Sequence, residues 1–577
     1  MNADGLLKHY ECVADAPDAI ARLRRFILDL AVRGKLVPQN QKDEPASELL
    51  NRLAKEKTRL AKAGVIRQRN TLPELSTSTV PFVVPTTWCW CRIGDLGVTQ
   101  TGTTPPKVKA EHYGDYVPFI KPGDLYPNRV DYSNEGLSQI GAKESGRIAG
   151  AGSILMVCIG TIGKCQAIDR DCSFNQQINS LSPCGETSSR YLLAVWESEF
   201  FQQAAWTASA RTTIAILNKG NWELLPIPLP PLAEQHRIVA KVDELMALCD
   251  RLEAARAERE ATRDRLAAAS LARLNAPDPA TFHDDARFAL DALPALTTRP
   301  DQIKHLRQTI LNLAVRGKLV PQDPSDEPAS ELLKRLKKAQ IAACSSEGLR
   351  ARSPVAKLSR GDMWFDFPDS WALSFFDDLF VIVSGVTKGQ KVAAHEAVDA
   401  PYLRVANVQR GHLDLSVIKK ITVRKTDEER YALRHGDVLM TEGGDWDKLG
   451  RAAIWREEVP GCIHQNHIFR VRPPSRDISP EWMIAYVNSL LGRAFFEDAS
   501  KQTTNLASIN MTQLRGCPFP LPPLAEQHRI VTKVNALMAL CDRLEASLTA
   551  TAATRRRLLD ALLAEALAPT QSRQEAA

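Results

Sequence analysis

Two stretches of the chain carry hydrophobic residues at alternating intervals of four and three positions. This spacing predicts the seam of a coiled-coil helix, although an ordinary amphipathic helix packed on a globular domain is the alternative. Prolines precede each stretch and suit an extended lead-in followed by a helix start. The seam positions are Ile238, Val242, Leu245, Cys249 and Leu252 in the first stretch and Ile530, Val534, Leu537, Cys541 and Leu544 in the second.

A second kind of helical pattern precedes each seam by roughly two hundred residues. In "ILDLAVRGKLVPQ" the apolar residues Ile27, Leu30 and Ala31 share one helical face, and Gly34 stands where the helix should end. The following "DEPASELL" predicts another helix with acidic residues and a proline near its start. The same two patterns return around Gly317.

The segments between these helices have a different pattern, with short apolar runs between turn residues. The strings "SILMVCIG", "DVLMTEG", "LFVIVSG" and "AIWREE" predict short strands bounded by turn residues. The strings "SSRYLLAVWESEFFQQAAW" and "SPEWMIAYVNSLLGRAFFEDA" predict helices near the end of each segment. Each segment is therefore predicted to be an α+β domain with a mixed sheet.

The helical patterns belong to an internal repeat. The string "PLPPLAEQHRIV" begins at Pro228 and again, unchanged, at Pro520, and "LAVRGKLVPQ" also occurs twice. The domain-like segments share only a faint skeleton. We predict an N-terminal helical block (1–80), a first globular domain (81–227), a central helical spacer (228–363), a second globular domain (364–519) and a C-terminal helical block (520–577).

Composition changes this picture little. The 577 residues exceed one hydrophobic core, and 44% hydrophobic with 25% charged residues is ordinary for a globular protein. The N-terminus lacks the apolar region of a secretory signal, no run of about 18 apolar residues predicts a membrane span, and the 12 scattered cysteines fit a reducing compartment. These features predict a cytoplasmic protein.

Catalytic chemistry is not visible in the sequence. There is no Walker A loop, no Asp/Asn-Pro-Pro-Tyr/Phe string of an amino-methylating centre, no G-x-S-x-G and no H-E-x-x-H, and no cysteine pair has the C-x-x-C spacing of a zinc site. The repeated His236 and His528 are interpreted as capping or packing groups at a helix start. The chain is therefore predicted to be a binding protein without catalytic residues, metal or cofactor of its own.

The two repeated motifs and their order resemble the specificity (S) subunit of type I restriction-modification enzymes over essentially the whole chain. The resemblance implies two target recognition domains, each reading one half of a bipartite double-stranded DNA site. It implies helical spacers that set the gap and dock two methyltransferase subunits, with two restriction subunits joining for cleavage. S-adenosylmethionine, ATP and magnesium are implied only for those partners. The implied architecture joins the domains by long antiparallel coiled-coil helices in a circular pseudo-twofold repeat.

Candidate DNA contacts are polar side chains on loops that follow predicted strands, because such side chains can reach base edges and phosphates. A plain surface turn is the alternative for the loops, and buried strand-end amides are the alternative for the paired Gln and Asn residues. Lys121 and Arg404 occupy matching places, as do Lys164 and Lys448 at the ends of two glycine loops. In the first domain the candidates are Thr101, Thr103, Thr104, Lys107, Lys109, Lys121, Lys164, Gln176, Gln177, Arg211 and Thr212. In the second they are Thr387, Lys388, Gln390, Lys391, Arg404, Asn407, Lys448, Gln465, Asn466, Lys501, Gln502, Thr503 and Asn505.

The charge distribution does not by itself mark the two domains as DNA readers. The net charge is +6, but residues 81–227 hold 12 basic and 13 acidic residues, and residues 364–519 hold 19 and 20. We therefore expect a local basic face on each domain, together with phosphate contacts from the methyltransferase partners. A rival hypothesis is a non-catalytic coiled-coil scaffold whose globular domains bind protein.

Overall fold

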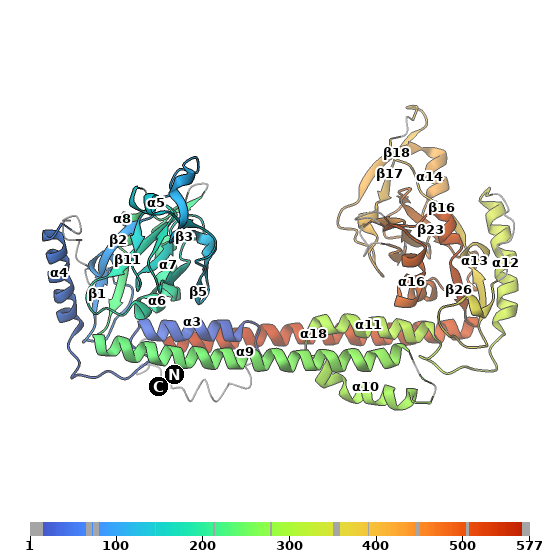
Figure 1. Cartoon of the computed structure of the whole chain (residues 1–577). Helices are drawn as coiled ribbons and strands as arrows, with labels where there is room; N and C mark the ends of the chain where they lie inside the picture. The colour runs from blue at the N-terminus through green and yellow to red at the C-terminus, as the bar shows by residue number, and fades with distance from the viewer. Residues whose placement is uncertain are drawn as a thin grey trace. The chain divides into compact units, whose positions relative to one another are not determined.

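A computed structural model of the chain describes residues 15–567 except 65–71, 73–74, 76–79, 145, 212–213, 277, 279, 350–357, 390–391, 445–448 and 503–506. The chain forms two compact units, one comprising residues 1–259 and 552–577 and the other residues 260–551. Each unit contains one globular domain of sheets and short helices together with several longer helices (Figure 1). Within the described helices, none combines the length and the apolar character that a membrane crossing requires.

The first globular domain is built on two four-stranded sheets. The first sheet has the order β2-β11-β8-β9 and the second the order β6-β3-β10-β7, in which β10 runs parallel to β3. An antiparallel pair, β1 with β14, joins the start of the domain to its end, with Cys89 opposite Leu229. The strands are β1 (Cys89–Arg92), β2 (Gly97–Thr101), β3 (Tyr113–Ile120), β6 (Gly136–Leu137), β7 (Ile148–Ala149), β8 (Ile154–Val157), β9 (Cys165–Ala167), β10 (Cys172–Phe174), β11 (Ile178–Pro183) and β14 (Pro226–Leu229).

The second globular domain repeats this plan with different residues. Its main sheet has the order β16-β23-β19-β21, a three-stranded sheet has the order β18-β17-β22 with β17 and β22 parallel, and β15 pairs with β26 as β1 does with β14. The mixed sheets confirm the predicted α+β class. The strands are β15 (Ala372–Phe375), β16 (Val381–Ser384), β17 (Ala397–Leu403), β18 (Lys419–Arg424), β19 (Val438–Thr441), β21 (Ala452–Ile454), β22 (Ile463–His464), β23 (Ile468–Arg472) and β26 (Pro518–Leu521).

Each predicted helical string near the end of a domain forms two helices separated by one serine. Ser198 separates α6 (Ser189–Glu197) from α7 (Glu199–Thr207), and Ser489 separates α15 (Pro480–Asn488) from α16 (Leu490–Ala499). Both serine hydroxyls donate to the carbonyl three residues earlier and accept the backbone N–H three residues later. A hydroxyl used in this way ends one helix and caps the next.

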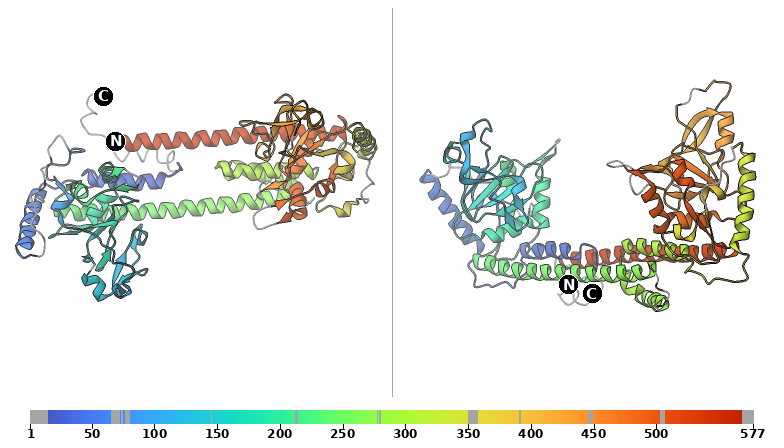
Figure 2. Two further views of the ribbon diagram at one scale, coloured as in Figure 1. Left: turned by 90° about the horizontal axis from the view of Figure 1, so that it is seen from above. Right: turned by 45° about the vertical axis from the view of Figure 1, so that its right-hand side comes forward.

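The same seam residues pack on an amphipathic helix in each unit. The predicted seam lies on α9 (Leu232–Asn275) and α18 (Leu524–Leu567), which are single uninterrupted helices (Figure 1). In the first unit α3 (Ala19–Val32) lies beside α9, with Arg24 bonded to Asp250 (2.7 Å) and Glu253 (2.8 Å). In the second, α11 (Pro300–Val315) lies beside α18, with Arg307 bonded to Asp542 (2.8 Å) and Glu545 (2.7 Å) (Figure 2).

The predicted helix ends after α3 and α11 are both present. Gly34 and Gly317 have φ of 68° and 64°, a left-handed conformation that favours glycine. An added Cβ at Gly34 would lie 2.4 Å from the ring of Pro85, and one at Gly317 would lie 2.3 Å from the ring of Pro368. The next helices, α4 (Ala46–Lys62) and α12 (Ala329–Ser346), begin directly after the predicted prolines, which act as the N-cap residues.

The repeated string makes one set of contacts in both units. In the first unit Gln39 donates to Glu234 (2.6 Å), and Arg237 donates to Asp43 (2.6 Å). The side-chain oxygen of Gln235 accepts the backbone N–H of Ser188, at the start of α6 (3.0 Å). In the second unit the same bonds join Gln322 to Glu526 (2.6 Å), Arg529 to Asp326 (2.6 Å) and Ser479 to Gln527 (3.0 Å). The identical residues are therefore joints between the helical blocks and the globular domain of each unit.

The first and last helices among the described residues meet within the first unit. The last turns of α18 lie against α3, where Arg22 forms an ion pair with Asp560 and Lys35 donates to the carbonyl of Leu567 (2.9 Å). Ala19 and Leu562 belong to a small apolar cluster at the same place. The first helical block therefore contacts the end of the last one, as a circular repeat predicts.

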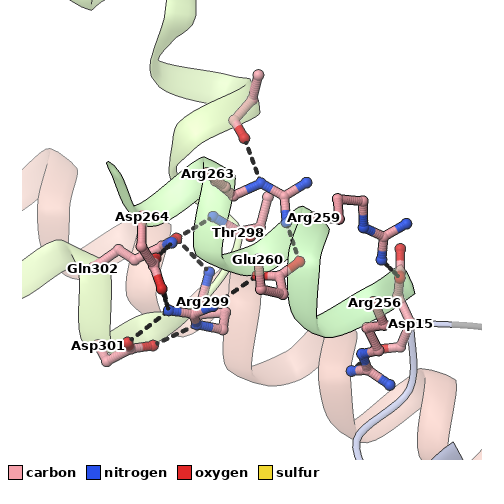
Figure 3. Close-up of polar contacts among 11 residues, drawn as sticks. Asp15, Arg256, Arg259, Glu260, Arg263, Asp264, Thr298, Arg299, Asp301 and Gln302 are labelled. Atoms are coloured by element: carbon pink, nitrogen blue, oxygen red, sulfur yellow. Dashed lines mark hydrogen bonds and ion pairs between the residues drawn. The ribbon is translucent and has the colours of Figure 1, made fainter. Parts of the chain in front are cut away.

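A polar cluster fixes α11 and the chain before it onto α9 in the second unit. Arg299 donates to Glu260 (2.7 Å), to Asp264 (2.9 Å) and to Asp301 (3.1 Å) (Figure 3). Gln302 donates to the same Asp264 (2.9 Å) and accepts the backbone N–H of Thr298. The connection between α10 (Phe282–Leu296) and α11 is thereby held in one register along α9.

Candidate nucleic-acid interface

The threonine-rich loop after β2 lies against the end of β10 in the first domain. Gly102 packs so closely on this strand end that a Cβ would overlap two carbonyl oxygens. Thr101 donates a hydrogen bond to Asn179 (2.8 Å), and the Thr104 hydroxyl donates to the side chain of Gln176. Two predicted groups of candidates, the loop and the strand-end amides, therefore form one surface. Of the remaining candidates here, Lys107 and Lys109 are exposed, and Thr103 and Gln177 are half-buried.

The second domain places its loop in the same way. Gly385 has no room for a Cβ, which would lie 2.0 Å from the carbonyl oxygen of His464. Val386 forms a parallel bridge with Gln465. The exposed candidates on this loop are Thr387 and Lys388, and the half-buried ones at the strand end are Gln465 and Asn466.

Lys121 and Arg404 begin equivalent turns, as their matching places in the sequence predict. The backbone N–H of Lys121 donates to the side chain of Asp124 (2.7 Å), and that of Arg404 donates to Asn407 (2.9 Å). Asn407 is only 3% exposed. The prediction that it contacts DNA is therefore wrong, because its amide holds the turn from inside the domain. The Lys121 side chain lies 2.5 Å from Glu135.

The strand register corrects the predicted equivalence of Lys164 and Lys448. Lys164 directly precedes β9, and the residue that directly precedes the corresponding strand β21 is Arg451. Lys448 itself lies outside the described residues. The registers that establish the correspondence pair Met156 with Cys165 and Met440 with Ala452.

The two Thr-Thr loops are only partly described. Arg211 belongs to β12 (Ala210–Arg211), and Lys501 and Gln502 form β24 (Lys501–Gln502), but the side chains of these three residues are outside the description. The candidates Thr212, Gln390, Lys391, Thr503 and Asn505 also lie outside the described residues.

Sequence reasoning missed a short hairpin in each domain. In the first domain β4 (Leu125–Tyr126) pairs with β5 (Arg129–Val130), and in the second Val408 forms a bridge with Leu413. Tyr126 at the first tip is 39% exposed, and Arg129 is exposed beside it. A shared spacing was the available signal. In both domains the four residues of the hairpin tip, 126–129 and 409–412, are followed by an apolar residue and then by Asp-x-Ser.

The packing residues of the long helices contact the amphipathic helices beside them. Ile238 and Val242 belong to the core that includes Ile27 of α3, and Ile530 and Val534 belong to the core of the second unit. Leu245, Leu537 and Leu544 are half-buried and pack against these cores, and Leu252 is half-buried without belonging to them.

The repeated histidines do not cap or pack, so that prediction is wrong. His236 and His528 are both exposed. The buried residues Glu234 and Gln235 occupy the side of α9 that faces the domain, which turns the next residue outward. Exposed leucines also recur at equivalent positions, since Leu248 is 43% and Leu540 is 49% exposed.

The comparisons with known sequences agree with one another. The family model described as type I restriction modification DNA specificity domain matches residues 85–260 and 368–552. The EcoAI specificity subunit of Escherichia coli, a type I restriction enzyme subunit, is 29% identical over 94% of this chain and 93% of its own length. The EcoEI specificity subunit of the same species is 29% identical over 95% and 94%. The HsdS subunit of Thermoanaerobacter tengcongensis aligns with a TM-score of 0.40 at 18% identity, covering 84% of this chain and 98% of that one.

Proposed function

The chain belongs to the family of type I restriction modification DNA specificity domains, and from this premise we propose that its two globular domains read two unlike half-sites of one DNA duplex. It is the DNA-specificity subunit of a restriction-modification system and carries no catalytic role of its own. The observation that supports bipartite reading is the contrast within the repeat. The joints of the helical blocks are the same in both units, whereas the loops on the two domains carry different side chains.

Two identical partners would explain why exposed residues repeat along with the buried ones. Contacts within each unit account for the buried Glu234 and Glu526, but not for the exposed Leu248 and Leu540. We infer that these leucines belong to the docking surfaces of two methyltransferase subunits, because equal surfaces bind equal partners. His528 also borders a shallow groove on α18, which continues this surface in the second unit.

The chemistry of methylation and cleavage belongs, on this proposal, to those partners. S-adenosylmethionine would bind the two methyltransferase subunits, and ATP and magnesium would serve two restriction subunits that join for cleavage. Because the ligand is genomic DNA, we expect the protein to act in the cytoplasm of a bacterial or archaeal cell.

The proposal is tested by long-read methylation mapping of a host that carries this chain with its methyltransferase partner. We expect one methylated motif with two defined halves separated by an unspecified gap of constant length. A host with the partner alone is the control and should lack the motif. Methylation at a single uninterrupted motif, or binding of the complex to random and bipartite duplexes with equal affinity, would overturn the proposal.

A further inference from the structure

The two hairpins missed in the sequence occupy equivalent places in the two domains. Both follow the turn that begins at Lys121 or Arg404, and both contain a left-handed residue at the third tip position, Asn128 with φ of 65° and Gly411 with φ of 85°. A positive φ at the third of four turn residues is the conformation that a type II turn requires. The backbone therefore takes the same path twice.

Equivalent hydrogen bonds, which together form a common frame, support both hairpins. The carbonyl of Asp124 accepts the backbone N–H of Asp131, and the carbonyl of Asn407 accepts that of Asp414, at 2.8 Å in each case. The carboxylates beyond the tips are equally engaged. Asp131 accepts the N–H (3.0 Å) and the hydroxyl (2.6 Å) of Ser133, and Asp414 makes the same two bonds to Ser416 (3.0 and 2.6 Å).

The tips on this common frame differ at every position. The first tip consists of Tyr126, Pro127, Asn128 and Arg129, and the second consists of Gln409, Arg410, Gly411 and His412. Fold requirements do not explain the difference, since the frame is shared. A surface that keeps its support and changes its side chains is the arrangement expected of a part that discriminates between ligands.

A cation directly before β9 in the first domain, and directly before β21 in the second, lies beside the first residue of each tip. The Lys164 ammonium lies 5.7 Å from the ring centroid of Tyr126, and the guanidinium of Arg129 lies 4.8 Å from the same centroid. In the second domain Arg451 donates to the side-chain oxygen of Gln409 (2.8 Å). Bracing of this kind lowers the entropy that the tip loses on binding.

These residues are candidates for the local basic face that we expect on each domain, because each domain as a whole is close to neutral. Lys164 and Arg129 lie at the first tip, where Lys164 also donates to the carbonyl of Pro122 (2.6 Å). Arg451 lies at the second tip, and the half-buried Arg410 of this tip donates to the side chain of Asn488 (3.4 Å). Arg129 is exposed, and no ion pair among the described residues involves it. Each hairpin tip therefore has cationic side chains at it, although each domain as a whole is close to neutral.

We propose that these two hairpin tips are base-reading elements of the protein, with the exposed Arg129 in the first domain and the exposed His412 in the second as specificity-determining residues. The major groove of DNA admits a two-stranded ribbon, and arginine pairs with guanine edges there. This inference rests on the proposed function, because it names the part of each domain that meets the bases. Lys164 and Arg451 are positioning residues that hold the tips in place.

The test exchanges one tip and leaves the frame intact. The fourfold variant Tyr126→Gln, Pro127→Arg, Asn128→Gly and Arg129→His gives the first domain the tip of the second. In the complex with the methyltransferase partner, methylation mapping should show a changed first half-site and an unchanged second half-site. The shared frame and the glycine at the left-handed position favour normal folding, which thermal unfolding checks.

A single substitution gives a finer readout on the same complex. Arg129→Ala should reduce discrimination at one base pair of the first half-site by about tenfold, measured by competition between duplexes that differ at that position. Arg170→Ala is the matched control. Arg170 is an exposed arginine of the same domain that lies over a different tyrosine, Tyr132 (4.5 Å), and its loss should leave both half-sites unchanged.

The outcomes separate this inference from the function on which it rests. If the exchanged chain still methylates the original bipartite motif, the hairpin does not read bases, while the proposed function stands. If the exchanged chain folds but methylates no site, the tip serves another contact and the inference also fails. If the unaltered chain directs no bipartite methylation, the proposed function itself fails.

Discussion

At the scale of single residues, two strands of each domain are joined at equivalent positions by different interactions. In the first domain Ser153 and Ser182 share a hydrogen bond of 2.7 Å between their hydroxyls. The corresponding positions of the second domain hold Asp437 and Arg472, which form an ion pair at 2.6 Å. Arg472 also pairs with Glu347 after α12 (2.6 Å), so the charges there are compensated inside the domain.

Arg470 and His464 complete this interior in the second domain. Arg470 is buried and donates to Glu347 (2.6 Å), and His464 is buried with its Nδ1 3.0 Å from the carbonyl oxygen of Ile468. Burial, together with the positive charge of Arg470, lowers the pKa of His464 to about 3. The imidazole is therefore neutral in the folded domain at neutral pH.

This interior predicts a specific loss of stability in mild acid. Between the unfolded pKa of about 6.5 and the folded value, only the unfolded chain binds a proton at His464, so stability falls as the pH falls. At about pH 5 the free energy of unfolding of the second domain should be lower by about 2 kcal/mol than at about pH 7.5 from this residue alone. His464→Asn should remove that part of the pH dependence in thermal unfolding. His435→Asn, an exposed histidine of the same domain, is the control, and equal pH slopes for the two variants would contradict the assignment.

At the scale of elements, α9 and α18 share two groups of identical residues, one buried and one exposed. Their buried identical residues maintain joints within each unit, as the bonds of Gln235 to Ser188 and of Gln527 to Ser479 show. Their exposed identical residues have no such internal explanation. An exposed leucine that recurs at the same place on a repeated helix is expected at a surface that binds a partner.

The docking surfaces can be tested one helix at a time. Leu248→Glu and Leu540→Glu should each weaken one methyltransferase contact by about 2 kcal/mol or more, because a charge would replace an apolar side chain that the bound subunit covers. Native mass spectrometry of the complex should then show one bound methyltransferase subunit for each single variant and none for the double variant.

The control for this experiment lies on α10, outside the repeat. Leu290 is 69% exposed, and Leu290→Glu should leave two methyltransferase subunits bound. If the single variants also keep two subunits, the repeated leucines are not part of the docking surface. If all three variants lose both subunits, general destabilisation rather than docking would explain the result.

At the scale of the whole molecule, α9 and α18 each contribute residues to both units. α9 runs from Leu232 to Asn275 while the boundary between the units falls at Arg259, and α18 runs from Leu524 to Leu567 while the boundary falls at Thr551. A helix lengthens by about 1.5 Å for every residue added. We therefore expect the two helices to set the length of the gap between the half-sites.

Inserting one heptad into both helices tests this role. Seven residues after Arg259 and seven after Thr551 add about 10 Å of helix, which corresponds to about three base pairs, and nearly preserve the helical face. Methylation mapping should show both half-sites unchanged and the gap longer by about three base pairs. The same seven residues inserted between α9 and α10 should leave the gap unaltered. An unchanged gap after the double helical insertion would show that another part of the protein sets it.

Some features of this protein were determined by the sequence alone. The exact repeat, the four-three spacing on α9 and α18, the glycines that end α3 and α11 and the four predicted strands, which became β8, β16, β19 and β21, are local signals, and the structure confirms them. They are predictable because helix periodicity, chain reversal at glycine and strand composition depend on neighbouring residues.

Other features were decided only by the tertiary structure. Arg451, and not Lys448, corresponds to Lys164, because strand register depends on hydrogen bonds between segments far apart in the chain. Asn407 is buried although its neighbour Arg404 is half-exposed, because the turn needs an acceptor inside the domain. The hairpin tips likewise become evident only from the structure, since their own residues differ and the shared Asp-x-Ser after them gains its meaning from the hydrogen bonds of the frame.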